Sequence, residues 1–396
     1  MASPLSRVRA EPRRGAMVAI GLIVAMAIAG RAQQMPPSPD AGALRAAVER
    51  GLRSAPLGFE ALQAPSQAGV RVLDVQVEQV GPATRITIDL SQKTLTYDPT
   101  GDVDAVVGRA IASTAPLLSR AGDVDFRFLV EGLPLDAFLS RPAPSQPARV
   151  LADPGAHRVV ISAGHGWYWN PWTSDWRLQR PRLWGIVEDL VNWDIAHYVA
   201  AQLDASVFQA QLVRHPTRDE LPGVSGWPAW QEAALYFMKA AAVPPAVWDI
   251  GVDDYARDIN TRPLYANWLD AVAVISIHNN GGEGTGTETW FDATNGHGAS
   301  SQRLAEVVNR RVVAAIRREY NPNWVDRGLR SCNGCKGENR LAARPAIILE
   351  IAFMDTRTPD NEALQDERFK QIVARAIRDA LHEWSGIAAP GRAGTD

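Results

Sequence analysis

Three things are scarce in this chain of 396 residues: cysteine, an excess of charge of one sign, and long apolar runs. The two cysteines, Cys332 and Cys335, are too few for a disulfide-rich scaffold or a four-cysteine zinc site. A formal net charge of -3 provides no basic excess for nucleic acid, so we expect no nucleic-acid partner. With 46% hydrophobic and 21% charged residues, the chain has the composition of an ordinary globular protein.

An apolar run at residues 16–30 follows four arginines and leads into the small-residue sequence Gly30-Arg31-Ala32. The run is shorter than the roughly 20 residues that span a bilayer, and its layout is typical of a signal peptide. We therefore expect export, with the membrane touched only by this segment before cleavage; a membrane anchor is the alternative. In an oxidising exported setting we expect Cys332 and Cys335 to pair, with two free thiols as the alternative.

The tryptophans mark a boundary in the chain, because all 13 of them lie after residue 150. A proline-rich stretch precedes this shift and is typical of a linker. Further upstream the chain is rich in Ala, Pro, Gln and Ser, with one helical pattern at residues 43–53. The predicted segments are a signal peptide, a flexible segment, a small α+β domain, a linker, a large domain and a flexible tail: 1–32, 33–69, 70–140, 141–156, 157–386 and 387–396.

The small α+β domain is predicted from patterns of period two at residues 70–80, 84–90 and 124–130 and a helical pattern at 103–118. In the large domain short apolar strands alternate with amphipathic helices, which predicts an α/β fold with a mostly parallel sheet covered on both faces. Functional sites in such folds lie beyond the carboxyl ends of the strands. The expected strands are 158–162, 208–213, 272–277, 287–291 and 346–351, and the expected helices are 185–203, 264–271, 300–320 and 367–384.

Two of the seven histidines, His165 and His278, end strand patterns and so fall on the predicted functional edge. Glu188 opens a helix, and Glu350 ends an apolar run where an unpaired carboxylate is costly to bury. Two imidazoles and one carboxylate around an open position form a hydrolytic zinc site, and a second carboxylate can act as its general base. The residue types alone also allow a purely structural role for these four side chains, because they are widely scattered along the chain and no local His-Glu-x-x-His occurs.

A series of motifs runs through the second half of the chain in a fixed order: Ile161–Gly166, Glu188 with Asn192, Leu212–Arg214, Arg262 with Ala266–Asn267, Ser276–His278, Gly286–Trp290, Asp326–Gly328 and Pro345–Glu350 leading into Phe353. Over about residues 157–385 this series resembles the type 3 family of zinc-dependent N-acetylmuramoyl-L-alanine amidases. The resemblance implies one Zn²⁺ ion held by His165, Glu188 and His278, Glu350 as catalytic base, and peptidoglycan as substrate. It also implies a single sheet of about six strands.

The chain departs from the family pattern at Ser162-Ala163, Trp167 and Ala352. None of these positions is a ligand, so the departures bear on loop shape and substrate fit. The side chains that we expect to contact the substrate are Asn192, Arg262, Asn267, Asn279, Trp167 and Trp169. The mature protein would act in the periplasm or at the cell wall.

Two aromatic insertions lie between His165 and Glu188 and between Arg214 and Arg262. They are interpreted either as a glycan-stacking wall or lid beside the zinc, or as a satellite core under a long insertion. Residues 70–140 loosely resemble the GerMN domain of sporulation and germination proteins, which implies a wall-associated accessory role or binding to a wall or divisome protein. An unrelated α+β spacer is the alternative.

Two other functions stay open for the whole chain. A zinc exopeptidase has a related fold, but it would need further acidic ligands for a second ion. An inactive peptidoglycan-binding module would keep the fold without the chemistry, and the presence of Glu350 with all three ligands argues against it.

Overall fold

The structure is a computed structural model that describes residues 39–53, 71–96, 103–139, 157–203 and 207–387. The predicted signal peptide, the linker and most of the predicted flexible segment and tail lie outside these ranges, so those interpretations stay predictions. Among the described residues, no helix combines the length and the apolar character needed to cross a bilayer.

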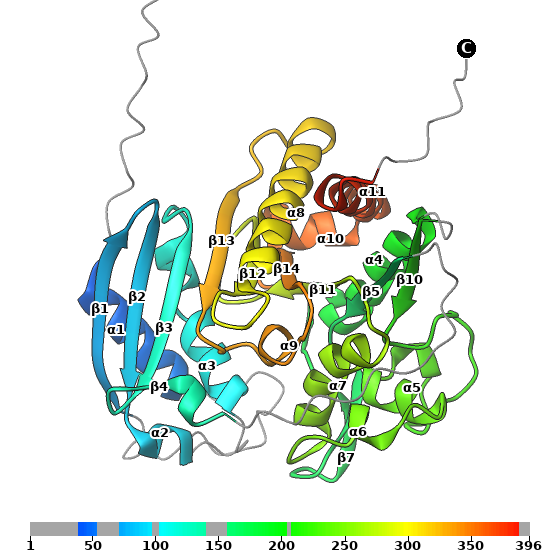
Figure 1. The fold of residues 1–396 in the computed structure, drawn as a ribbon, viewed down its shortest axis with the longest axis horizontal. Helices are drawn as coiled ribbons and strands as arrows, with labels where there is room; N and C mark the ends of the chain where they lie inside the picture. Colours follow the sequence, from blue (N-terminus) through cyan, green and yellow to red (C-terminus); the bar gives the residue numbers. More distant parts are fainter. Residues whose placement is uncertain (1–38, 54–70, 97–102, 140–156, 204–206, 388–396) are drawn as a thin grey trace, which may run out of the picture. The chain divides into compact units, whose positions relative to one another are not determined.

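Ten strands form one sheet, and six consecutive strands of it come from the predicted large domain (Figure 1). Neighbouring pairs among these six are parallel except β12 with β14. The predicted α/β fold with a mostly parallel sheet is therefore confirmed. In spatial order the six strands are β13 (Asp326–Cys332), β12 (Thr287–Asp292), β14 (Ala346–Phe353), β11 (Ala273–Asn280), β5 (His157–Ala163) and β10 (Phe208–Leu212).

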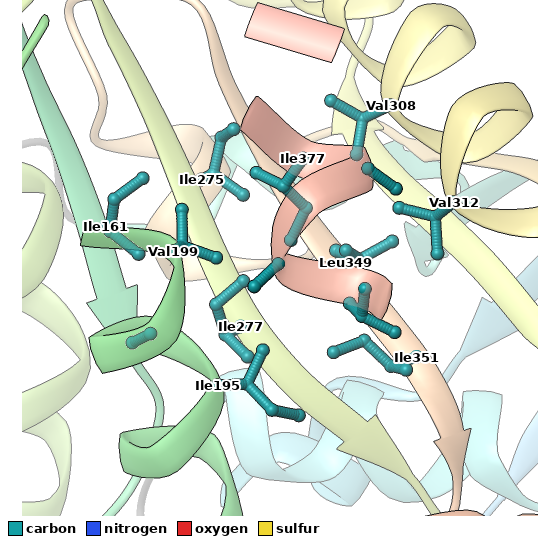
Figure 2. Close-up of a cluster of buried hydrophobic side chains, with 14 of the residues drawn as sticks. Ile161, Ile195, Val199, Ile275, Ile277, Val308, Val312, Leu349, Ile351 and Ile377 are labelled. Atoms are coloured by element: carbon teal, nitrogen blue, oxygen red, sulfur yellow. The ribbon is translucent and has the colours of Figure 1, made fainter. Parts of the chain in front are cut away.

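Successive strand residues face opposite sides of the sheet, and both sides are buried. Ile275 and Ile277 of β11 lie in the core under α4 (Glu188–Gln202), α8 (Gly298–Glu319) and α11 (Glu367–Ser385), as Figure 2 shows. Val274, the residue before Ile275, faces the opposite side and packs in a second core with α5 (Ala234–Ala240), α6 (Pro245–Trp248) and α7 (Asp254–Trp268). Each fully buried Ile or Leu contributes about 1.5–3 kcal/mol, so this two-sided burial holds β5, β11 and β14 in place.

The N-terminal module, residues 41–139, forms the elements that its pattern predicts. Strands β1 (Val72–Val80), β2 (Ala83–Leu90) and β3 (Val124–Val130) stand beside helix α3 (Val103–Ala112). The helical pattern near residue 43 is also confirmed, because α1 (Ala41–Arg53) buries Leu44, Val48 and Leu52.

The module shares the sheet of the large domain, contrary to the expectation of a separate small domain. Strand β3 pairs in parallel with β13, with Val124 opposite Arg330 and Phe126 opposite Cys332 (Figure 1). Beyond the last pair, the Asn333 side chain accepts from Phe128 N at 3.0 Å and donates to Phe128 O at 3.2 Å, as a further strand residue would. The tryptophan boundary therefore does not divide the sheet.

The two parts also share one hydrophobic core. Phe126 of β3 stacks on Trp290 of β12 with ring centroids 5.6 Å apart. Val106 and Ile111 of α3 belong to the same buried cluster as Trp290 and Ile348. This core covers the face of α3 that carries Val106, Val107, Ala110 and Ile111.

Strand β13 was missing from the sequence prediction. Cys332 ends this strand and forms a disulfide with Cys335, as expected. Helix α4 begins at Glu188, three residues later than predicted, because residues 185–187 belong to a small hairpin. The remaining elements are α2 (Gln92–Thr96), η1 (Ala115–Leu118), β4 (Leu133–Pro134), η2 (Leu135–Ala137), β6 (Trp167–Asn170), β7 (Asp175–Leu178), β8 (Arg182–Leu183), β9 (Ile186–Val187), η3 (Ala229–Gln231), α9 (Gly337–Arg340), η4 (Arg357–Asn361) and α10 (Glu362–Gln365).

Candidate active site

Three buried side chains converge at the carboxyl edge of the sheet. His165 follows β5, His278 lies near the end of β11, and Glu188 is the first residue of α4. His165 Nε2 lies 3.1 Å from His278 Nδ1 and 3.2 Å from Glu188 Oε1. His278 Nδ1 lies 3.4 Å from the same Glu188 oxygen. The structure thus brings together the three ligands predicted from the sequence.

The spacing of these three atoms fits a zinc ion. Ligand atoms at 2.0–2.1 Å from a tetrahedral ion lie about 3.3 Å from one another, which matches the three separations. One carboxylate and two imidazoles are a common donor set for hydrolytic zinc. Among the described residues, His165, Glu188 and His278 form a group of side chains that could hold a metal ion.

The loop that carries His165 needs two glycines. His165 itself has a φ of 67°, a left-handed conformation that is costly for a residue with a side chain and that often occurs at functional sites. A Cβ on Gly164 would lie 2.2 Å from the His278 ring, so only glycine lets the two histidines approach. A Cβ on Gly166 would lie 2.5 Å from the backbone of Ala233. The Gly-His-Gly sequence is therefore required by packing.

Each of the two histidines is held through its other ring nitrogen. His165 Nδ1 donates to Gln179 Oε1 at 2.8 Å, and His278 Nε2 donates to Glu338 Oε1 at 2.9 Å. These bonds place the free lone pairs on His165 Nε2 and His278 Nδ1, the two atoms that face the metal position.

A chain of polar contacts connects the two supporting groups. Gln179 Nε2 donates to Asp258 Oδ2 at 2.9 Å, and Arg262 donates to the same Asp258 oxygen. Arg262 Nη1 also donates to Glu338 Oε1 at 2.7 Å. Asp258 and Arg262 are one turn apart on α7, so a single helix positions both histidines. We call Gln179, Asp258, Arg262 and Glu338 the supporting network.

The third side chain of this group, Glu188, is oriented by two asparagines. Its Oε1 accepts from Asn192 Nδ2 at 3.2 Å and from the backbone N of Asn279 at 3.0 Å. Asn279 Nδ2 in turn donates to Asn192 Oδ1 at 2.8 Å. Arg180 Nε lies 3.5 Å from the other carboxylate oxygen. Burial opposes ionisation of Glu188, but the neighbouring His165 and the hydrogen bonds to both histidines hold its pKa well below the usual value.

The two histidines have opposite electrostatic environments. Burial lowers the pKa of His165 to about 3, and the Arg180 charge acts in the same direction. Burial also opposes protonation of His278, but the Glu338 carboxylate and the hydrogen bonds to Glu188 and Glu338 outweigh it and raise the pKa to about 9. Both rings are buried, so the difference follows from the neighbouring charges: Arg180 near His165 and the Glu338 carboxylate beside His278.

Glu350 lies beside this centre, directly opposite His278 in the pairing of β14 with β11. It is 8% exposed, and its Oε2 has no hydrogen-bond partner among the described residues. Burial raises the pKa of Glu350 to about 7, against the lowering effect of the His278 and Lys336 charges. A carboxyl group in this environment exchanges a proton near neutral pH, as a general base must.

A cavity of about 320 Å³ opens in front of these groups. His165, Glu188, His278 and Glu350 line it together with Asn279. All four residues predicted to carry the chemistry are thus exposed to one space.

The residues that were expected to contact the substrate are placed differently. Asn192 and Arg262 are fully buried and bind protein groups. Arg262 also lines the cavity, so contact of these two side chains with the substrate stays a prediction. Asn267 bonds to the backbone of Leu341 and of residue 343, which anchors the loop before β14. Asn279 lines the cavity as expected.

The two tryptophans of β6 do not line the cavity. Trp167 stacks on Trp227 with centroids 4.6 Å apart, and Trp169 is 38% exposed and packs edge-on against Trp176. The first aromatic insertion thus forms a hairpin with its own aromatic contacts, and a glycan-stacking role for Trp169 stays a prediction.

Sequence reasoning missed Gln179, Asp258 and Glu338. Asp258 carried a usable signal, because it stands four residues before Arg262 on one helix face and such pairs interact. Gln179 lies within an aromatic insertion and Glu338 in a short helix after the disulfide, and neither position has a local pattern that separates it from a surface residue.

Comparison with known proteins gives a family match for the large domain. A family model described as N-acetylmuramoyl-L-alanine amidase matches residues 159–383, which is more than half of the chain. No curated protein matches. The family match does not extend to residues 70–140, so the GerMN resemblance stays a prediction.

Solved structures give weaker likenesses. An N-acetylmuramoyl-L-alanine amidase from Clostridium difficile 630 is 19% identical, with 59% of this chain and 100% of that chain covered and a TM-score of 0.40. The catalytic domain of CwlV from Bacillus (Paenibacillus) polymyxa var. colistinus is 21% identical, with 59% and 99% covered and a TM-score of 0.40. AmiC2 of Nostoc punctiforme is 23% identical, with 58% and 97% covered and a TM-score of 0.39.

Proposed function

Because this chain belongs to the N-acetylmuramoyl-L-alanine amidase family, we propose that it cuts the amide between N-acetylmuramic acid and L-alanine in peptidoglycan with one zinc ion. His165, Glu188 and His278 would hold the ion. The observation that carries this proposal is the separation of their donor atoms, 3.1 to 3.4 Å, in the same cavity as Glu350.

The proposed chemistry divides between the ion and Glu350. Bound zinc supplies a coordinated water with a pKa of about 7 and polarises the amide carbonyl. Glu350 accepts the proton of the attacking water at Oε2. As the C–N bond breaks, Glu350 returns this proton to the nitrogen of L-alanine, so the muramic acid keeps a carboxylate and the peptide leaves with a free amine. The pKa of about 7 suits both transfers.

The products of purified peptidoglycan test the reaction. We expect the protein to release stem peptides that carry a new amino-terminal L-alanine, identified by mass spectrometry and end-group labelling. Chelation should abolish the release, and added zinc should restore it. Release of free amino acids from peptide ends, without such stem peptides, would contradict the amidase proposal and favour a zinc exopeptidase.

The zinc ligands are tested by His165→Gln with His157→Gln as its control. Both histidines belong to the same strand region, but His157 is exposed at the start of β5 and far along the strand from the cavity. Elemental analysis should find one zinc per chain in the wild type and in His157→Gln and almost none in His165→Gln. Equal zinc content in the two variants would remove His165 from the ligand set.

Export of the protein from the cytoplasm is also a proposal. Peptidoglycan lies outside the cytoplasm, and the Cys332–Cys335 disulfide fits an oxidising compartment. Fractionation of cells that express the whole chain should find the protein outside the cytoplasm with residues 1–32 removed. An intact N-terminus in the cytoplasmic fraction would contradict export.

A further inference from the structure

The cavity in front of Glu350 is built from both parts of the chain. One side comes from the large domain and carries the three proposed ligands. The other side is helix α3 of the N-terminal module, which turns one face toward the cavity: Asp104, Ala105, Gly108, Arg109 and Ala112. The opposite face of the same helix is buried in the shared core.

Contacts at both ends hold α3 against the large domain. Near its first turn, Asp104 receives two hydrogen bonds from Arg340, at 2.7 and 3.1 Å. At its last turn, a Cβ on Gly282 would lie 2.2 Å from the carbonyl oxygen of Ala112, so the loop after β11 lies directly against the helix. The helix is therefore a fixed part of the cavity wall.

The cavity face of α3 combines small side chains with two charged ones, Asp104, which Arg340 neutralises, and Arg109. Ala105, Gly108 and Ala112 take up little space, and a Cβ on Gly108 would meet no atom within 4 Å. Arg109 of the helix and Lys336 of the loop after the disulfide both line the cavity.

Unpartnered polar groups indicate that a ligand belongs in this space. Glu350 Oε2 has no hydrogen-bond partner among the described residues, and the Glu350 side chain is more than nine-tenths buried. Asn279 Oδ1 is in the same situation, and Asn279 is 4% exposed. Buried polar atoms without a partner are costly unless another molecule supplies one.

We propose that α3 is the specificity wall of the active site: its small residues make room for the peptide stem of the substrate, and Arg109 with Lys336 binds a carboxylate of that stem. This inference rests on the proposed amidase function. It gives the N-terminal module a direct part in substrate recognition, since Arg109 reaches the reaction space from outside the segment matched by the family.

The size of the wall is tested at Gly108. Gly108→Ala and Gly108→Leu occupy the same helical position, and both replace a residue that weakens helices, so neither should lower the melting temperature. We expect Gly108→Leu, which projects into the cavity, to lower kcat/KM on purified peptidoglycan by at least about tenfold, and Gly108→Ala to have a much smaller effect. Wild-type activity in Gly108→Leu, with zinc and melting temperature unchanged, would overturn the proposal.

The charge of the wall is tested by binding, without turnover. In the Glu350→Gln background, calorimetry measures the affinity for three muramyl peptides. One has free carboxylates, one is amidated at the side chain of the stem, and one is amidated at its C-terminus. We expect Arg109→Gln and Lys336→Gln each to weaken binding of the free acid by roughly tenfold and to leave one of the amidated peptides unaffected. Arg120→Gln, an exposed arginine that follows η1, is the control.

The outcomes separate this proposal from the proposed function. If the wild type releases no stem peptides, the amidase function fails, and the binding arm still reports whether the wall takes a carboxylate. If the wild type is active but Arg109→Gln and Lys336→Gln bind the free acid as tightly as Glu350→Gln alone does, the charge assignment is overturned. An increase in kcat/KM for Gly108→Leu would also overturn it, because a wall that makes room for substrate cannot gain from being filled.

Discussion

The two proposed histidine ligands face each other across the same centre, but their supports differ in charge. His165 donates to the neutral amide of Gln179, and His278 donates to the carboxylate of Glu338. The pKa of His165 is lowered to about 3, whereas that of His278 is raised to about 9. The comparison teaches that two neighbouring buried histidines can be tuned separately, one by burial and a nearby positive charge and the other by a carboxylate partner.

The largest effect should come from removing the charged support. Glu338→Ala leaves the His278 Nε2–H and Arg262 Nη1 without their buried acceptor. Since supporting groups of this kind change metal affinity by about 10- to 100-fold, we expect a loss near 100-fold in zinc affinity, measured by competition with a chelator. Glu362→Ala, an exposed glutamate of α10, is the control. Wild-type affinity in Glu338→Ala would show that the carboxylate does not support the ligand.

The pH dependence of zinc binding sharpens the comparison further. Without the ion, His278 has a raised pKa of about 9, so its proton stabilises the fold below the ordinary value of 6.5 and this contribution is lost as pH rises through about 9. Zinc must displace that proton, and below pH 9 we expect affinity to rise by about tenfold per pH unit. His165, with a pKa of about 3, has no proton to lose in this range.

Calorimetry in buffers of different ionisation enthalpy measures this proton directly. We expect about one proton to be released per zinc at pH 7 in the wild type and clearly less in Glu338→Gln, which removes the charge that raises the pKa of His278. No proton release in the wild type would mean that His278 is neutral before the metal binds.

A smaller effect on zinc affinity is expected from removing Gln179, the neutral partner of His165. Gln179→Ala removes the acceptor for His165 Nδ1 and the donor to Asp258, but it leaves no uncompensated charge next to the histidine. We expect zinc affinity to fall by about tenfold, the lower end of the usual range. A loss as large as that of Glu338→Ala would contradict the difference between the two supports.

The smallest expected effect is the energetic coupling between substitutions of Gln179 and Glu338. Gln179 and Glu338 are joined through Asp258 and Arg262, so their substitutions should not be independent. In a double-mutant cycle on zinc affinity we expect a coupling of at least about 0.5 kcal/mol. Strict additivity would indicate that the supporting network acts as two separate halves.

These contrasts also show what the sequence could predict. His165, His278 and Glu350 were identified because apolar strand patterns end at them, and strand ends meet at one edge of a parallel sheet. Glu188 was identified by its place at the start of a helix and in the family pattern. Gln179 and Glu338 reach the same centre from an insertion and a short loop helix, where no periodicity reports the direction of a side chain.

The joining of the two parts was beyond sequence reasoning for a similar reason. The strands of the N-terminal module were predicted within a few residues, but β3 and β13 pair across about two hundred residues, and β13 itself was not recognised. The cavity face of α3 depends on that pairing, since it is the joined sheet that brings Gly108 and Arg109 to the reaction space. The sequence also did not predict that Asn192 and Arg262 are fully buried, because burial is a property of the packed fold.

The central claim is that Glu350 performs the proton transfers beside a zinc ion that three other residues hold. Glu350→Gln keeps the shape of the side chain and removes its basicity. The account predicts that this variant carries one zinc per chain, binds muramyl peptides, and releases stem peptides from peptidoglycan at least about 100-fold more slowly than the wild type. Near wild-type release by zinc-loaded Glu350→Gln would contradict the account.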